Sequence, residues 1–203
     1  MPAEIISFLI ASIALTISPG PDIIYVLVQS MSTNKKDGIA VSLGLVSGII
    51  IHTSLVAFGV SAIIKASENL FFIIKVAGAA YLLFLAYKVW KSNENLDFSG
   101  KSNVSGFKKM FSRGFLMNVL NPKVTIFFLA FFPSFIWSPD ENLIYQFYIL
   151  GFLFMLQAIL IFGIVAFLAE KITRFLNKNK QTQLFFKYLQ IIVFLGIAIL
   201  IFV

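Results

Sequence analysis

Long apolar stretches alternate with short polar segments along the whole chain. The apolar stretches predict helices at about 5–30, 39–61, 70–90, 114–136, 143–169 and 184–203. About twenty apolar residues, rising 1.5 Å each, cross the roughly 30 Å hydrocarbon core of a bilayer. The polar and apolar positions do not alternate as they do in a membrane β-barrel. The pattern therefore predicts an all-α polytopic membrane protein with six transmembrane helices.

The longest polar segment divides this single membrane domain into two halves. We expect a first three-helix half at 1–91, a cytoplasmic linker at 92–112 and a second three-helix half at 113–203. Because three is odd, related halves must lie in the membrane with opposite orientations, as inverted repeats do in many secondary transporters.

Two proline sites interrupt the first and fourth of these helices. The first site is Ser18-Pro19-Gly20-Pro21-Asp22, and the second is Asn121-Pro122-Lys123. Proline lacks a backbone N–H and clashes with the preceding turn, and lipid cannot satisfy the polar groups that it frees. We therefore expect helices 1 and 4 to be broken inside the protein. Each site also carries a charge, which costs about 2.5–3.5 kcal/mol in a membrane and marks a functional position.

The two charges have competing interpretations. In the functional interpretation, Asp22 binds a cationic group of a substrate or carries a proton. In the structural interpretation, it only caps a helix that restarts at Ile23. Lys123 lies too deep to reach an interface and needs a partner, for which Asp22 is the candidate. Such a pair can be purely structural or can exchange with a substrate.

Three further polar residues belong to the candidate site. Asn118 and Asn121 lie three positions apart and can serve either a substrate or the broken backbone. His52 is either a hydrogen-bonded packing residue or a proton relay, because its charge changes near neutral pH without help. Proton coupling would therefore fall to Asp22 or His52.

Composition agrees with a membrane protein and narrows the chemistry. Hydrophobic residues make up 59% of the chain, charged residues 12%, and phenylalanine occurs 24 times. With no cysteine, one histidine and no carboxylate cluster, we expect no metal and no cofactor. A phosphate-binding loop is also absent, so any pumping must use an ion gradient or a partner.

The net charge of +7 follows from topology and needs no nucleic-acid partner. Thirteen of the sixteen Lys and Arg residues fall in the connections after spans one, three and five. The positive-inside rule therefore places these connections in the cytoplasm and both termini outside. The same basic residues can contact anionic membrane lipid. On span two, Gly44-x-x-x-Gly48 favours close helix packing within the chain, although it also permits a homodimer.

Four motifs together resemble one transporter family. They are Ile17-Ser18-Pro19-Gly20-Pro21-Asp22, the segment from Gly38 through Gly48 to His52, Lys75 with Gly78-Ala79-Ala80-Tyr81-Leu82, and Gly114-Phe115 through Asn118-Val119-Leu120-Asn121-Pro122-Lys123. In this order and spacing they are similar to the LysE/RhtB family of amino-acid exporters. Where that family tends to have Pro-Gln-Phe, this chain has Pro133-Ser134-Phe135, which leaves the substrate open.

The resemblance implies a proton-coupled exporter in the bacterial inner membrane, acting on basic or neutral amino acids such as lysine, threonine or homoserine. It places Asp22, Asn118, Asn121, Pro122 and Lys123 in the translocation region. We expect the two halves to rock around this region in alternating access. The alternatives are a metal or small-ion exporter on a similar scaffold, a membrane-embedded enzyme, and a purely structural membrane subunit.

Overall fold

The computed structural model describes residues 2–92, 106–178 and 180–202, and every regular element in this part is a helix. The elements are α1 (Pro2–Ile17), α2 (Pro21–Ser32), α3 (Lys35–Leu55), η1 (Val56–Val60), α4 (Ser61–Ala66), α5 (Glu68–Lys91), α6 (Phe107–Val119), α7 (Pro122–Ile126), η2 (Phe127–Phe131), η3 (Phe132–Phe135), α8 (Leu143–Lys178) and α9 (Lys180–Leu200). The chain is thus an all-α protein, as predicted.

Four helical stretches in the described residues are long and apolar enough to cross a membrane. They are Lys35–Ile64, Glu68–Lys91, Leu143–Leu176 and Gln181–Leu200. Two further pairs pass the same test but are bent, α1 with α2 by 55° and α6 with the α7–η3 segment by 47°. Counted as one span each, the bent pairs raise the number to six. The structure is therefore that of a multi-pass membrane protein with broken first and fourth helices, as the prolines predicted.

Two predicted boundaries differ from the structure. Helix α6 already begins at Phe107, inside the predicted linker 92–112, and α8 continues to Lys178 instead of ending near 169. Both extensions are polar turns, which a hydropathy pattern does not count as membrane helix although the backbone remains helical. On α8, Arg174 forms an ion pair with Glu170, which lies one helical turn earlier, and this i, i+4 pair stabilises the extra turns. Residues 93–105 of the linker lie outside the described part, and the division into halves stays a prediction.

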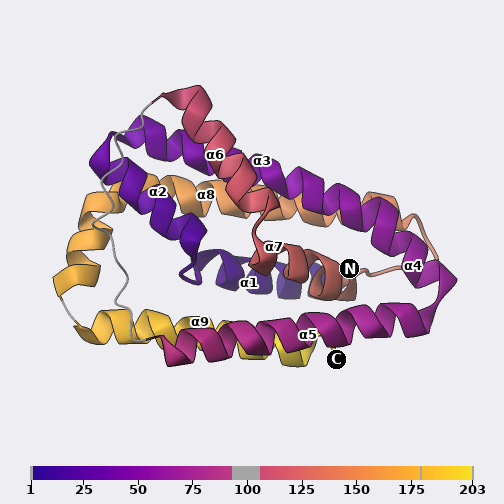
Figure 1. The fold of residues 1–203 in the computed structure, drawn as a ribbon. Coiled ribbons are helices and arrows are strands. Elements are labelled where there is room, and N and C mark those ends of the chain that lie inside the picture. Colours follow the sequence, from indigo (N-terminus) through magenta and orange to yellow (C-terminus); the bar gives the residue numbers. More distant parts are fainter. Residues whose placement is uncertain (1, 93–105, 179, 203) are drawn as a thin grey trace.

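The helices lie in two layers with α1 and α7, one half of each broken helix, between them (Figure 1). Helices α3, α6 and α8 lie side by side in one layer, and α5 pairs with α9 in the other. Between the layers lie α1 and α7, whereas α2 packs against α3 and α8. Both chain ends lie toward the α4 end of the bundle, as an even number of spans requires.

Close contact between α3 and α6 depends on two glycines. A Cβ on Gly44 would lie 2.1 Å from the carbonyl oxygen of Phe111, and one on Gly114 would lie 2.2 Å from that of Val41. No side chain fits between the two backbones at either point. The glycine face of α3 therefore packs within the chain, as the sequence favoured, and a homodimer would have to use another surface.

Buried phenylalanines fill the bundle between α1, the η2–η3 segment and the first half of α8. The ring of Phe132 lies 5.4 Å from that of Phe8, 4.5 Å from that of Phe128 and 5.7 Å from that of Phe147. All four side chains are buried. Since Phe8 precedes the first break and Phe132 follows the second, this phenylalanine cluster lies on the side of the breaks that faces the chain ends.

Candidate functional site

The first break separates α1 from α2 at Ser18, Pro19 and Gly20. Gly20 is the N-cap in an extended conformation (φ −148°), and Pro21 is the first residue of α2. In a continuous helix the Ser18 carbonyl would accept a hydrogen bond from the backbone N–H four residues later. Here it instead accepts one from the Nζ atom of Lys123, at 3.0 Å. A side chain from the fourth span therefore satisfies a carbonyl that the first break frees.

The second break separates α6 from α7 at Leu120 and Asn121. The Asn121 side chain caps α7, because its Oδ1 accepts the backbone N–H of Lys123 at 3.0 Å. Pro122 has no N–H to donate to the Asn118 carbonyl four residues earlier. That carbonyl lies 3.1 Å from Nε2 of His52 and accepts the Asn121 backbone N–H at 2.9 Å.

His52 therefore contacts the carbonyl freed at the second break, as Lys123 contacts the one freed at the first. A carbonyl oxygen can only accept, so Nε2 of His52 must carry the proton in this contact. The imidazole is buried and stacks on Phe128, with ring centroids 5.5 Å apart. Of the two interpretations of His52, the geometry shows the hydrogen-bonded packing residue, and its role as a proton relay stays a prediction.

Asp22 and Lys123 flank one small space beside Gly20. A Cβ on Gly20 would lie 2.5 Å from Oδ1 of Asp22 and 3.5 Å from Nζ of Lys123. Both charged side chains are buried. The structure thus brings together the two charges that the sequence predicted as partners, although the Lys123 amine is hydrogen-bonded to the Ser18 carbonyl and Asp22 Oδ1 has no hydrogen-bond partner.

The capping role considered for Asp22 is wrong in its details. Helix α2 restarts at Pro21 and not at Ile23, and its N-cap is Gly20 without a side-chain cap. Pro21 fits this first position because its missing N–H would be unpaired there anyway. Asp22 lies in the first helical turn, where its negative charge still complements the positive end of α2.

Several other buried acceptor oxygens around the breaks have no hydrogen-bond partner. Oδ1 of Asn118 lies 2.5 Å from where a Cβ on Gly48 would be, so only glycine leaves it room. Oε1 of Gln29 and Oε1 of Gln157 are also unpartnered. Buried polar groups are normally paired, and unpaired acceptors suit a ligand that brings hydrogen-bond donors.

The sequence reasoning missed Gln29 and Thr16 as parts of this polar interior. Gln29 lies seven residues after Asp22, a spacing that places both on one face of α2. Thr16 accepts a hydrogen bond from Nε2 of Gln157 at 3.0 Å, which joins α1 to α8. The i, i+7 spacing was a usable signal for Gln29. Nothing in the sequence pairs Thr16 with a residue 141 positions away.

The described residues offer no metal site. No three His, Asp or Glu side chains gather there where they could hold a metal ion, and the sequence has no cysteine.

Paired broken helices with buried charges at the bundle centre define a class of protein, the membrane translocators. Comparison with known families makes this specific. The chain belongs to the LysE type translocator family, whose model matches residues 13–203. It is a transport protein and not an enzyme, and the predicted resemblance is confirmed.

Individual relatives are similar over most of their length. The chain is 30% identical over 177 residues to a homoserine/homoserine lactone efflux protein of Salmonella typhimurium, covering 87% of this chain and 85% of that protein. An uncharacterized membrane protein of Vibrio cholerae is 28% identical over 181 residues (88% and 87%). The uncharacterized membrane protein YrhP of Bacillus subtilis is 29% identical over 198 residues (93% and 94%). No solved structure matches.

Proposed function

We propose that this protein exports basic or small neutral amino acids, such as lysine, threonine or homoserine, from the cytoplasm by proton-coupled alternating access. Membership of a translocator family and similarity to a homoserine efflux protein support the proposal. The observation that carries it is the unpartnered Oδ1 of Asp22, buried beside the Lys123 amine where two half-helices begin.

A zwitterionic amino acid matches the charges at this point. Its ammonium group donates to Asp22 Oδ1, which has no donor in the structure. Its carboxylate meets the Lys123 amine and the free N–H groups at the start of α2. Both contacts are charge-assisted hydrogen bonds to buried side chains, and such bonds are stronger than those between neutral groups. Pro19, Gly20, Pro21 and Pro122 shape this site by keeping the two helices broken.

Proton coupling requires a group that changes charge during the cycle. A proton on Asp22 neutralises the carboxylate that holds the substrate ammonium, so proton and substrate compete for one group. His52 is the second candidate, because it lies one hydrogen bond from the second break. Exchange of proton for substrate at Asp22 is the simplest antiport scheme that these residues allow.

The membrane orientation is part of the proposal. The basic connections lie in the cytoplasm and both termini lie on the periplasmic side of a bacterial inner membrane. The phenylalanine cluster of Phe8, Phe128, Phe132 and Phe147 then lies on the periplasmic side of the site and closes it there. Rocking of the two halves would move Phe8 away from the other three rings and release the substrate outward.

Transport by purified protein in proteoliposomes tests the role of Asp22. We expect Asp22→Asn to abolish amino-acid flux driven by an imposed proton gradient, whereas the matched control Asp140→Asn, in an exposed turn, keeps the wild-type rate. Asp22→Asn flux at the wild-type rate would refute the role. The same vesicles tested for divalent-cation flux separate amino-acid export from the metal or small-ion alternative.

A further inference from the structure

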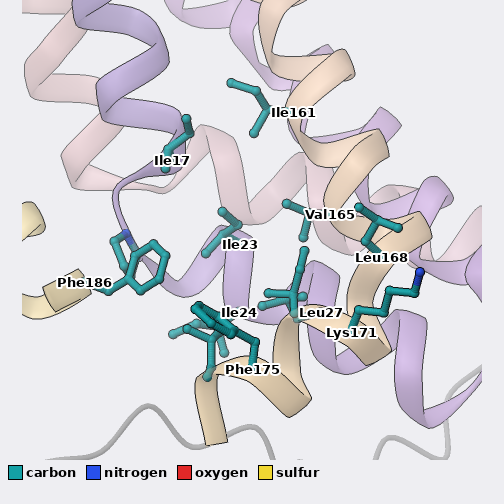
Figure 2. Close-up of a pocket in the computed structure, with 13 residues that line it drawn as sticks. Ile17, Ile23, Ile24, Leu27, Ile161, Val165, Leu168, Lys171, Phe175 and Phe186 are labelled. Carbon is teal, nitrogen blue, oxygen red and sulfur yellow. The ribbon is translucent and has the colours of Figure 1, made fainter. Parts of the chain in front are cut away.

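A long apolar cavity opens beside the first break, between α2, α8 and α9. Its volume is about 370 Å³, and its lining includes Ile17 and Pro19 at the break, Phe175 on α8 and Phe186 on α9 (Figure 2). Among the thirteen residues that line it, Lys171 is the only one with a polar side chain. The aliphatic part of Lys171 borders the cavity and its amine points away from the centre.

The cavity has a buried floor and an exposed rim, so it is a groove in the outer face of the bundle. Leu27 on its floor is 3% exposed, whereas Leu168 on its rim is 42% exposed. Leu168 lies inside the predicted span 143–169, where an exposed side chain meets lipid and not water. The groove is therefore open to lipid.

The groove is apolar along its α8 side. Its lining there runs from Ile161 to Leu176, a stretch over which α8 turns toward α9 (Figure 1). A free amino acid needs polar partners, and the lining offers none between the break and Lys171.

Charge is found only at the end where a lipid headgroup would lie. Lys171 is exposed, and no ion pair in the described part of the chain involves it. Its neighbours Glu170 and Arg174 pair with each other. A lysine at the membrane surface attracts anionic lipid.

We propose that this groove binds one acyl chain of an anionic phospholipid, with the lipid phosphate against Lys171. The lipid belongs to the leaflet on the side of the basic connections. The acyl chain then reaches the first break and packs against Ile17 and Pro19 at its inner end. This groove adjoins the transport site proposed above at Pro19, but binding in it does not depend on which amino acid is exported.

Photolabelling of the full-length protein tests the proposal. The probe is phosphatidylglycerol with a diazirine on its acyl chain, added to protein in phosphatidylcholine nanodiscs, and the labelled peptides are mapped by mass spectrometry. We expect labels to concentrate on α2 and on the 161–176 part of α8. Unlabelled phosphatidylglycerol should compete better than phosphatidylcholine. Because one surface lysine contributes about 1 kcal/mol, Lys171→Gln should lower this preference about five-fold, and the control Lys88→Gln should not.

Adjacent residues on α8 give a matched pair for filling the groove. Ile161 lines it, whereas Leu160 is 66% exposed and does not line it. Ile161→Trp should reduce labelling of the groove, and Leu160→Trp should leave it unchanged. Lys171→Gln changes only an exposed side chain, so the test holds even if Ile161→Trp fails to fold.

Three results would overturn the proposal. Labels spread evenly over the lipid-facing side of α5 would show nonspecific contact. Displacement of the label by the exported amino acid would make the groove a substrate vestibule. Cross-links from the groove to a second copy of the chain would make it an interface.

Discussion

The hydrogen bond between His52 and the second break gives the sharpest test of the site. Pro122 cannot donate to the Asn118 carbonyl, and Nε2 of His52 donates in its place at 3.1 Å. If His52 stabilises the protein by replacing the missing backbone donor of Pro122, restoring an N–H at position 122 should make the His52 hydrogen bond dispensable for stability. The perturbation is therefore the pair His52→Phe and Pro122→Ala, made singly and together.

The expected magnitude follows from the contacts. Leaving a buried acceptor without its donor costs about 1–3 kcal/mol. The Asn118 carbonyl keeps the Asn121 N–H at 2.9 Å, so we expect the low end, about 1 kcal/mol, when Pro122 is present. Where Pro122→Ala lets α6 and α7 join into a continuous helix, the new backbone N–H donates to the Asn118 carbonyl, and the cost of His52→Phe attributable to this bond should fall to nearly zero. The coupling energy between the two positions is then about 1 kcal/mol.

The assay is reversible unfolding of the purified protein in mixed micelles, for wild type, both single variants and the double variant. Phenylalanine keeps an aromatic ring against Phe128, and any packing error from it is common to both backgrounds and cancels in the cycle. An equal cost of His52→Phe in the wild-type and Pro122→Ala backgrounds would refute the reasoning. His52 would then be present for packing or proton transfer and not for the freed carbonyl.

Three further predictions use the same unfolding assay. Gly44→Ala should destabilise the protein by about 1–3 kcal/mol, because the new Cβ meets the α6 backbone. The control Gly163→Ala, with open space around the new Cβ, should be neutral or stabilising. Equal effects of the two substitutions would contradict the close packing of α3 and α6. Lys123→Met should lower the free energy of unfolding by about 3–5 kcal/mol, because it leaves Asp22 buried without a nearby cation. Adding Asp22→Asn should recover part of this loss. A double variant no more stable than Lys123→Met would show that the two charges do not interact. Phe132→Ala should cost about 3–5 kcal/mol, as for other fully buried rings, and a loss below about 1 kcal/mol would show that the phenylalanine cluster is not a packed core.

The fold could be predicted largely from local rules. Twenty-residue apolar stretches gave the number of spans, and proline chemistry gave the position of both breaks, because each rule depends only on residues close in sequence. Helix ends outside the membrane were less well predicted. The start of α6 at Phe107 and the end of α8 at Lys178 depend on polar turns that hydropathy does not register.

The site residues could be named from the sequence, but their partners could not. Asp22 and Lys123 were predicted to be neighbours because two buried opposite charges attract each other. The sequence did not show that Lys123 donates to the Ser18 carbonyl or His52 to that of Asn118, because these contacts join residues 105 and 66 positions apart. The first pairing depends on how α7 lies beside the first break, and the second on how α3 packs against α6, where Gly44 and Gly114 allow close contact.

The two breaks follow one physical rule, and that rule links substrate binding to movement in the proposed cycle. At each break a nitrogen of a titratable side chain from another span satisfies the freed carbonyl, Lys123 for Ser18 and His52 for Asn118. A substrate carboxylate would draw the Lys123 amine toward itself, since a charged acceptor binds an ammonium more strongly than a neutral carbonyl does. Although the ammonium has three N–H donors, a shift of Nζ away from the first break lengthens its bond to the Ser18 carbonyl, which raises the energy of the closed arrangement relative to one with water at the break. Substrate binding would thereby weaken the contact that holds spans one and four together, which alternating access requires.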